Sequence, residues 1–512
     1  MLIRTALRIH PGDVVALVGG GGKTTLMFRL ADELVVDGLK VVTTMTTKIF
    51  VEQMSRAPAR LVLQGEGALL SQLPGLLAEH GHVLLAGGTI VEQEKVQGLG
   101  CALIDRIAAH PSVDVIVIEA DGARCLPFKA PAAHEPVIPA ATSVVVPIVG
   151  LDVIGHPLTA EFVHRPERVA ALTGASLGDP VTPAMVAAVL AHPLGGAKGT
   201  AAARLVPFIN KSDVGAGIGE RGSGTAEREP DTGDRILDAG DRNLQSWANE
   251  VGPIFNLQSR APAAARETAR LLLQHPRVSA VLIGAAQTDD PIHEVWGRVH
   301  AVVLAAGEAR RYGSLKQLLP WEGLPLVAHV VRQALACPDI DRVAVTVGAQ
   351  EAAVRDALGV LSGDPRLQIV AVPDWSAGQS RSVRAGLAAV TAGPGHSAPP
   401  TPAPPVGTDP GPAGAAVFLL ADQPGVTPEL LTALIQRHRE TLAPVVAPRH
   451  AGQRGNPVLF DRTTFAAIAA LTGDTGARAI IRQHQHRVAY VDWPTDDVLK
   501  DIDTPADYRP PP

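Results

Sequence analysis

The sequence of 512 residues is poor in cysteine, in aromatic residues and in long apolar runs. Its three cysteines, Cys101, Cys125 and Cys337, include no C-x-x-C pair, which excludes a disulfide framework and a structural zinc site and indicates a reducing compartment. No stretch of about 18 apolar residues occurs, and the N-terminal MLIRTALRIHPGD lacks the apolar core of a signal peptide. The sequence therefore predicts a cytoplasmic protein that does not bind a membrane.

Positive charge is also scarce, and lysine is the scarcer of the two basic residues. The 45 Lys and Arg residues face 51 Asp and Glu residues, a net charge of -6 that argues against a nucleic-acid partner. Only 9 of the 45 basic residues are lysines, so those that remain are favoured candidates for phosphate contacts. Five of them fall within the motifs described below: Lys23, Lys48, Lys129, Lys211 and Lys316.

The abundant feature is apolar sequence in an alternating pattern. Hydrophobic residues make up 46% of the chain, enough for two or three domain cores. Short β-branched runs such as VVALVG, VDVIVIEADG and TSVVVPIVG alternate with helical patterns, and the alternation restarts near residue 298. We predict two tandem three-layer α/β domains, residues 1–297 and 298–512, with a mobile loop at 214–235 and a Pro/Gly-rich insert at 391–414.

A glycine-rich loop follows the first apolar run. In VVALVGGGGKTT, four glycines, a lysine and a hydroxyl stand where a strand meets a helix, as a phosphate-binding loop requires. Leu17 occupies the first glycine position of the usual G-x-x-x-x-G-K-[ST] pattern, and a glycine turn without a ligand is the alternative. The predicted nucleotide-binding residues are Gly19, Gly20, Gly21, Gly22, Lys23, Thr24 and Thr25.

Two later segments extend this predicted site. Glu119 and Asp121 end the strand VDVIVIEADG, where they would hold Mg²⁺ together with Thr24, although a plain Asp-Gly turn also fits. In ARLVPFINKSD, N-K-x-D follows a buried strand, the pattern with which GTPases read guanine; its residues are Asn210, Lys211 and Asp213. The N-terminal domain is therefore predicted to bind a nucleoside triphosphate, GTP or ATP.

The second half opens with another small-residue loop, AVVLAAGEARRYGSLKQLLP. Small side chains let a base or phosphate approach the backbone after the strand, and Arg311 and Lys316 can neutralise a triphosphate. An ordinary strand followed by a solvated basic loop is the alternative. Asp422 ends the later strand AAVFLLADQP, the edge where ligands of open α/β sheets bind, although a turn-forming aspartate is equally compatible.

These segments resemble the molybdenum cofactor cytidylyltransferases of the MobA-like nucleotidyltransferase superfamily. The family motif L-A-A-G-x-S-x-R-x-G-x-x-K departs from this sequence only at Ala309, which replaces the serine. The matching positions are Leu304, Ala305, Ala306, Gly307, Arg311, Gly313 and Lys316. Further matches follow in order as PDWSAGQSRSVRAGL, LLADQPGVT, RGNPVLF, GDTGAR and DIDTPADY.

The resemblance implies a Rossmann-like domain that transfers CMP from CTP to molybdopterin-bound molybdenum and releases pyrophosphate. Ala306 stands where guanylyl-transferring relatives have glycine, which favours CTP over GTP. The implied catalytic residues are Lys316, Arg311 and Asp422, and the implied magnesium ligands are Asp422 and Asp503, with Asp501 ranked lower. Nucleotide contacts are implied for Gly378, Ser380 and Ser382, which would otherwise form a helix N-cap, and a substrate contact for Asn456.

The N-terminal half resembles the YqeC-type accessory proteins linked to selenium-dependent molybdenum hydroxylases. The resemblance lies in LVGGGGKTTLMFRLA, VTTMTTKI, EADGARCLPFKAPAAHEPVIP and GLDVIGHPL. It implies a P-loop NTPase-like domain that assists a client molybdenum hydroxylase. Two alternatives stay open: a nucleotidyltransferase for another phosphorylated acceptor such as a sugar phosphate, and a cofactor-binding chaperone with weak transferase activity, for which Ala309 leaves room.

Overall fold

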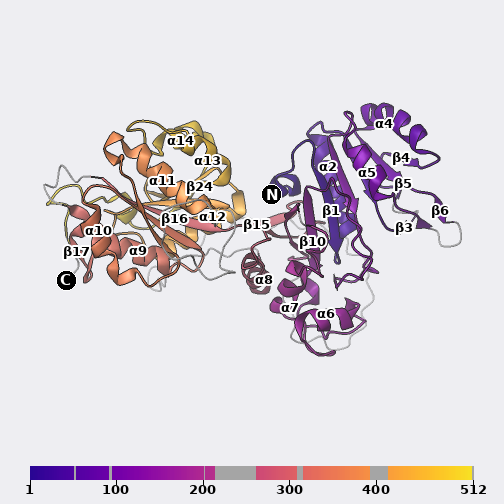
Figure 1. Cartoon of the computed structure of the whole chain (residues 1–512), viewed down its shortest axis with the longest axis horizontal. Coiled ribbons are helices and arrows are strands. Elements are labelled where there is room, and N and C mark those ends of the chain that lie inside the picture. The colour runs from indigo at the N-terminus through magenta and orange to yellow at the C-terminus, as the bar shows by residue number, and fades with distance from the viewer. Residues whose placement is uncertain are drawn as a thin grey trace, which may run out of the picture.

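The computed structural model describes residues 1–50, 54–90, 95–200, 202–213, 261–307, 315–392 and 413–509. Within these residues the chain forms two large β-sheets, one from each half of the sequence, and each sheet is covered by helices (Figure 1). The predicted loop at 214–235 and most of the predicted insert lie outside the described residues. An α/β fold in both halves is thus confirmed.

The first sheet is parallel throughout except at one edge, where β14 and β15 run antiparallel. Its strand order is β15 (Ile292–Trp296), β14 (Val281–Gly284), β13 (Phe208–Asn210), β10 (Val144–Gly150), β1 (Val14–Gly19), β8 (Val115–Glu119), β2 (Val41–Met45), β5 (His82–Ala86) and β4 (Ala59–Val62), and β12 (Arg204–Leu205) also pairs with β10. β1 lies in the middle, so the glycine-rich loop emerges at the centre of the sheet.

Both faces of this sheet are buried. Along β1, Val14, Ala16 and Val18 pack into one core, whereas Val15 and Leu17 pack into another. Because alternate side chains point to opposite faces, a strand buried on both sides reads as a continuous apolar run. One core is covered by α1 (Ile3–Leu7) and α2 (Lys23–Val36), and the other by α4 (Glu66–His80), α5 (Cys101–Ala108), α6 (Pro166–Thr173), α7 (Pro183–Ala191) and α8 (Ala263–Leu273).

One predicted strand is divided. The run ARLVPFIN forms two short strands, β12 and β13, on either side of Val206 and Pro207. Proline has no backbone N–H to donate to a neighbouring strand, so the ladder to β10 is interrupted there and resumes at Phe208. The small strands β3 (Ile49–Phe50), β6 (Thr89–Ile90) and β7 (Lys95–Val96) form a separate sheet, as do β9 (Phe128–Lys129) and β11 (Val163–His164).

The second sheet is mixed. Its strand order is β20 (Leu367–Ala371), β19 (Arg342–Val347), β16 (Val299–Ala305), β21 (Ala415–Leu420), β24 (Val458–Asp461), β22 (Val445–His450) and β23 (Gln453–Arg454), with β25 (Val488–Asp492) beside β22. The first four strands are parallel, and β24 runs antiparallel to both of its neighbours. The carboxyl ends of β16 and β21 therefore meet at one edge of the sheet.

Helices cover both faces of the second sheet as well. One core lies under α9 (Leu326–Ala336), α10 (Glu351–Ala357) and α12 (Pro428–Thr441), and the other under α11 (Gln379–Thr391), α13 (Phe465–Ala469) and α14 (Arg478–Gln483). A hairpin of β17 (Pro320–Trp321) and β18 (Leu324–Pro325) precedes α9. In the part of the chain that the structure describes, no helix is long and apolar enough to cross a membrane.

The two halves meet where α12 packs on β15 (Figure 1). Gln436 Nε2 donates to Glu294 Oε1 over 2.9 Å, and the Arg439 guanidinium lies 3.5 Å from the centre of the Trp296 ring. At the connection between the sheets, Arg298 is fully buried and donates to the backbone carbonyl of Val278 over 2.7 Å. These contacts join the halves through polar and cation–π interactions on specific side chains.

Candidate functional site

The small-residue loop of the second half starts at the end of β16. Ala305 and Ala306 are buried, and Gln317 Nε2 donates to the carbonyl oxygens of Ala305 (3.2 Å) and Gly307 (3.0 Å). Gln317, in the 3₁₀ turn η3 (Lys316–Leu318), therefore holds this loop in place. The sequence analysis did not single out Gln317; its position directly after Lys316 was the available signal.

Lys316 brings together the two carboxylates predicted from the sequence. Its Nζ lies 2.5 Å from Asp422 Oδ2 and 2.8 Å from Asp503 Oδ1, and its side chain is 16% exposed. Asp422 follows β21, and the amide of Ile502 donates to the Asp422 carbonyl over 3.1 Å, which fixes the DIDTP segment against that strand end. Three residues far apart in the sequence thus converge at the carboxyl edge of the sheet.

The electrostatics of this cluster follow from its burial and its charges. Burial alone would lower the pKa of Lys316, but the Asp422 and Asp503 carboxylates outweigh it and raise this pKa above its ordinary value. Burial raises the pKa of Asp501, and the neighbouring Asp422 and Asp503 raise it further, while a hydrogen bond from Gln423 opposes the shift. Lys316 thus stays protonated and charged, whereas Asp501 ionises less readily than an ordinary aspartate because its pKa is raised.

The donor set suits a magnesium ion. Asp422 Oδ1 is buried and has no hydrogen-bond partner among the described residues. Mg²⁺ takes one or two carboxylates together with substrate phosphates and waters, so Asp422 and Asp503 would suffice without a larger cage. Consistent with that small set, the described residues contain no group of three or more His, Cys, Asp or Glu side chains that could hold a metal.

The other predicted residues of this half lie around the same edge. Gly378 is the N-cap of α11 with φ 121°, and the Ser380 hydroxyl donates to the Gly473 carbonyl over 2.6 Å. Ser380 and Ser382 lie within α11, after its N-cap, and both are buried. The Ser380 bond ties the segment GDTGAR to α11. The backbone N–H of Asn456 donates to the carbonyl of Val498 over 2.9 Å, and Val498 lies in the 3₁₀ turn η8 (Asp496–Leu499).

Two predicted residues, Arg311 and Gly313, lie outside the described residues, as does Ala309.

The glycine-rich loop of the first half is shaped by close packing of backbone on backbone. Gly19, Gly21 and Gly22 have φ values of 94°, 80° and 128°, which glycine adopts at little cost. A Cβ at Gly21 would collide with the backbone nitrogen of Gly150 at the end of β10. These glycines are therefore required by contacts within the protein, whether or not a ligand is bound.

Part of the loop's hydrogen-bonding capacity is used internally. Gly19 donates to the Asp121 carboxylate, Gly20 to the Ile148 carbonyl and Gly21 to the Leu126 carbonyl. The backbone N–H groups that follow, from Gly22 to Thr25, have no acceptor among the described residues. The first helical hydrogen bond of α2 is donated by the Leu26 N–H to the Gly22 carbonyl. Four unpaired N–H groups at a helix N-terminus can donate hydrogen bonds to a bound anion.

Side chains at this loop form a buried charged cluster. Lys23, 5% exposed, donates to the Gly19 carbonyl over 2.6 Å and lies 3.3 Å from Asp121 and 3.7 Å from Glu119. The Thr24 hydroxyl donates to Glu119 over 2.8 Å. Burial raises the pKa of Glu119, and the Lys23 charge opposes that shift. Of the predicted metal-facing residues of this half, Thr24 and Glu119 contact each other, and Lys23 lies between Glu119 and Asp121.

A second layer behind Asp121 was missed by the sequence analysis. Lys129 is buried and bridges Asp121 (3.0 Å) and Glu135 (2.8 Å), and Arg165 binds Glu135 over 2.7 Å. Burial would raise the pKa of Glu135, but Arg165 and Lys129 lower it to about 2. The scarcity of lysine pointed to Lys129, but its partners are separated from it in sequence.

The N-K-x-D segment lies next to the same loop. Asn210 Nδ2 donates to the Gly21 carbonyl over 2.7 Å, and its Oδ1 accepts from the Ala286 amide over 2.9 Å. Lys211 binds Asp152 over 2.6 Å, and Asp213 is exposed. Asn210 therefore joins the glycine-rich loop to the end of β14, and Lys211 and Asp213 lie beside it.

Comparisons with known proteins match the two halves of the chain to two different families. Residues 15–167 match the YqeC protein family and residues 301–488 match the MobA-like NTP transferase domain. The chain is 35% identical over 201 residues to the uncharacterised protein YqeC of Escherichia coli, covering 39% of this chain and 75% of that protein. It is 29% identical over 211 residues to the purine catabolism protein PucB of Bacillus subtilis, covering 40% of this chain and 92% of PucB.

A solved structure resembles part of the chain. The homologue of Mycobacterium tuberculosis Rv0371c from Mycobacterium sp. strain JC1 has a TM-score of 0.33 and 31% identity, and the match covers 41% of this chain and 93% of that one.

The C-terminal half carries a MobA-like NTP transferase domain. The chain belongs to the YqeC family through its N-terminal half, and it fuses that domain to the MobA-like NTP transferase domain.

Proposed function

We propose that the C-terminal half transfers CMP from CTP to molybdopterin-bound molybdenum and releases pyrophosphate. The observation that carries this proposal is the convergence of Lys316, Asp422 and Asp503 at the carboxyl ends of β16 and β21. A cation and two carboxylates beside a loop of small residues suit a triphosphate and its counter-ion. The preference for CTP rests on Ala306, whose backbone lies at the strand end that a base would approach.

In this reaction a phosphate oxygen of the acceptor attacks the α-phosphorus of CTP. The new P–O bond forms as the bond to the β-phosphate breaks, and pyrophosphate leaves with the electron pair. Lys316, whose pKa is raised, stays charged and neutralises phosphate oxygens, while Gln317 keeps Ala305 and Gly307 in position for the nucleotide. Mg²⁺ at Asp422 and Asp503 would neutralise the triphosphate. Arg311 is proposed to add a further positive charge.

We also propose supporting roles for the remaining predicted residues. Leu304, Gly313, Gly378, Ser380 and Ser382 would shape the nucleotide site, with Ser380 acting through the segment that it anchors. Asn456 would face the acceptor. The boundary between the two functions would lie between β15 and β16, so that residues 1–297 and 298–512 form the two domains.

We propose further that the N-terminal half binds GTP or ATP on its glycine-rich loop and assists maturation of a client molybdenum hydroxylase. The four unpaired amides from Gly22 to Thr25 carry this proposal. Thr24, Glu119 and Asp121 would hold a magnesium ion, and Lys23 would exchange its carboxylate contacts for phosphate contacts. Lys211 and Asp213 would contact the base, positioned through Asn210.

The decisive experiment offers the full chain each labelled nucleoside triphosphate with Mg²⁺, and either molybdopterin-bound molybdenum or a panel of sugar phosphates. Pyrophosphate release only with CTP and the pterin supports the proposal. Release with a sugar phosphate would replace it by the broader nucleotidyltransferase function. Tight pterin binding without release under any condition would replace it by a chaperone function.

A further inference from the structure

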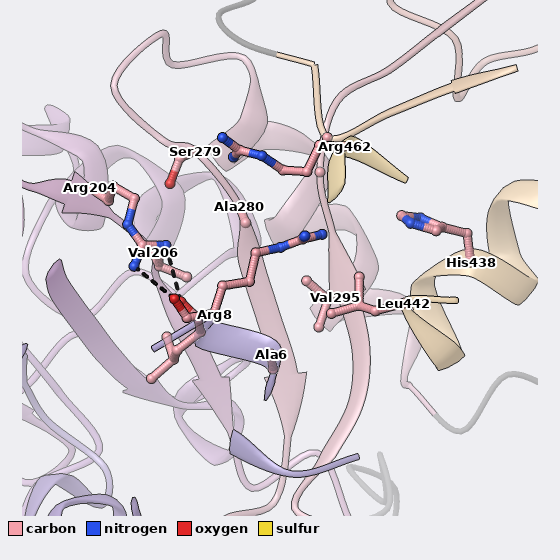
Figure 2. Close-up of a pocket in the computed structure, with 13 residues that line it drawn as sticks. Ala6, Arg8, Arg204, Val206, Ser279, Ala280, Val295, His438, Leu442 and Arg462 are labelled. Atoms are coloured by element: carbon pink, nitrogen blue, oxygen red, sulfur yellow. Dashed lines mark hydrogen bonds between the residues drawn. The ribbon is translucent and has the colours of Figure 1, made fainter. Parts of the chain in front are cut away.

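A small pocket lies at the junction of the two halves, and none of its lining residues belongs to either predicted nucleotide site. It is lined by the end of α1, by β12 and β15, by α12, and by the 3₁₀ turn η6 (Arg462–Thr464) (Figure 2). The cavity measures about 30 Å³. That volume holds about two water-sized groups, so it would accept oxygens of one small ion and exclude a nucleoside.

The lining of this pocket is strongly positive. Arg8, Arg204 and Arg462 enter it from three different elements, His438 joins them from α12, and the lining contains no carboxylate (Figure 2). We call these three arginines the junction arginines. Such a concentration of cations at a part-buried site costs free energy unless negative charge balances it.

Asp461, just behind the lining, balances only one of the junction arginines. Arg8 binds both carboxylate oxygens of Asp461, over 3.0 and 2.6 Å, and His438 binds the same carboxylate over 2.8 Å. Burial would raise the pKa of Asp461, but His438 and Arg8 hold it well below its ordinary value. The carboxylate is therefore a permanent anion whose two oxygens are already engaged.

The other two junction arginines lack a close carboxylate. Arg204 donates to the backbone carbonyls of Leu7 and Arg8, and its nearest carboxylate, on Asp13, is 3.9 Å away. The Arg462 guanidinium has no hydrogen bond or ion pair to any described residue, and the side chain is exposed at the pocket. Partial burial lowers the pKa of Arg462, and the charges of Arg8 and Arg204 lower it further, while the neighbouring Asp461 carboxylate opposes the shift. Arg462 thus has no direct partner among the described residues, and Arg204 has only a long ion pair with Asp13.

We propose that this pocket binds a single phosphate-sized oxyanion, held by Arg462 and Arg204 and bridging the two halves of the chain. Guanidinium groups form paired hydrogen bonds with phosphate oxygens. The Ser279 hydroxyl also lines the pocket, but it donates to the Leu205 carbonyl over 3.1 Å. The oxyanion is either inorganic phosphate or the terminal phosphate of a larger molecule whose remainder stays in solvent. Because Arg204 belongs to the first sheet and Arg462 follows the second, binding holds the halves together.

The test measures binding of inorganic phosphate to the full chain by calorimetry, with pyrophosphate and acetate as comparison ligands. We expect one phosphate bound at this pocket, with affinity at least tenfold weaker in Arg462→Gln and in Arg204→Gln. Arg355→Gln, an exposed arginine paired with Glu351 on α10, is the matched control and should leave the affinity unchanged. Arg462 makes no contact that folding depends on, so that variant stays informative even if Arg204→Gln unfolds.

The glycine-rich loop also offers anion donors, so Lys23→Ala is the second arm. Phosphate binding retained in Lys23→Ala and weakened in Arg462→Gln assigns the ion to the junction arginines. The reverse pattern, or equal affinity in Arg462→Gln and the parent, overturns the proposal. Acetate binding as tight as phosphate overturns the choice of oxyanion. Pyrophosphate is also the product of the proposed transfer, so only pyrophosphate binding that Arg462→Gln weakens assigns the terminal phosphate of a larger molecule to this pocket.

Discussion

The chain carries two small-residue loops at the carboxyl ends of central strands, and they are built differently. The first, at residues 19–25, leads directly into α2, a helix of 14 residues. The second, beginning at Ala305, is held from outside by Gln317 in a three-residue 3₁₀ turn. The first therefore leaves backbone amides free at a helix N-terminus, whereas the second is surrounded by charged side chains.

The lysines of the two sites differ in their exposure and in the groups that they contact. Lys23 is 5% exposed and contacts a backbone carbonyl as well as two carboxylates, while Lys316 is 16% exposed and contacts carboxylates alone. A metal ion or phosphate chain reaches the more exposed site with less rearrangement. The comparison teaches that similar sequence signals, a lysine and two acids near small residues, are built around free backbone amides in one half and around charged side chains in the other.

The largest expected effect is a loss of transfer activity when the site of the second half is changed. Asp422→Asn removes the carboxylate charge that contacts the Lys316 ammonium and whose Oδ1 has no partner among the described residues. We expect the rate of transfer to fall about 10³-fold, since charge stabilisation of this kind is worth that much. Pyrophosphate release with CTP and the pterin is the measurement. Asp492→Asn, at an exposed ion pair with Arg449, is the control. Retained activity in Asp422→Asn would remove the metal-binding assignment.

The next effect concerns stability. Gly21→Ala forces a side chain into φ 80° and against the Gly150 backbone, so we expect a loss of about 3 kcal/mol in the unfolding free energy of the first half. Among the described residues, a Cβ at Gly307 meets nothing within 4 Å, so Gly307→Ala should change stability little. Gly12→Ala controls for strain alone, since it has φ 94° and open space. Denaturant unfolding gives the values; equal losses at Gly21 and Gly307 would contradict the difference between the loops.

A pH effect on stability is expected in the first half. The pKa of Glu135 is about 2 in the folded protein, below the ordinary value of about 4.3 in the unfolded chain. A lowered folded-state pKa contributes stability above the unfolded value, and that stability is lost as pH falls from about 4.3 towards 2. Glu135→Gln should cost about 2 kcal/mol at neutral pH and flatten this acid decline, as followed by urea unfolding at several pH values. An unchanged slope would exclude Glu135 as its source.

The smallest effect tests the backbone-based site. Lys23→Ala removes one cation but leaves the four unpaired amides, so we expect only about a tenfold loss of GTP or ATP affinity in the first half. Lys40→Ala, an exposed lysine beyond α2, should have no effect. Fluorescent nucleotide binding measures the difference. Equal affinity in Lys23→Ala and the parent would refute the phosphate loop.

Much of the fold could be predicted from the sequence because strands buried on both faces read as continuous apolar runs. VVALVG and TSVVVPIVG became β1 and β10, and the restart near residue 298 falls between β15 and β16. The prediction failed to divide ARLVPFIN at Pro207, although proline alone was a sufficient signal. Resemblance, and not periodicity, supplied Asp503, since an exposed aspartate in a loop has no pattern of its own.

The sequence by itself determined where the small-residue loops, the strand-end carboxylates and the scarce lysines stand along the chain. Only the tertiary structure decided which of them meet, because hydrogen bonds and ion pairs depend on distances between segments that sequence order does not specify. Lys316 reaches Asp503 across 187 positions, and Lys129 closes onto Asp121 and Glu135 in a buried layer. Arg8 and Asp461, 453 positions apart, meet beside a pocket that neither half forms alone.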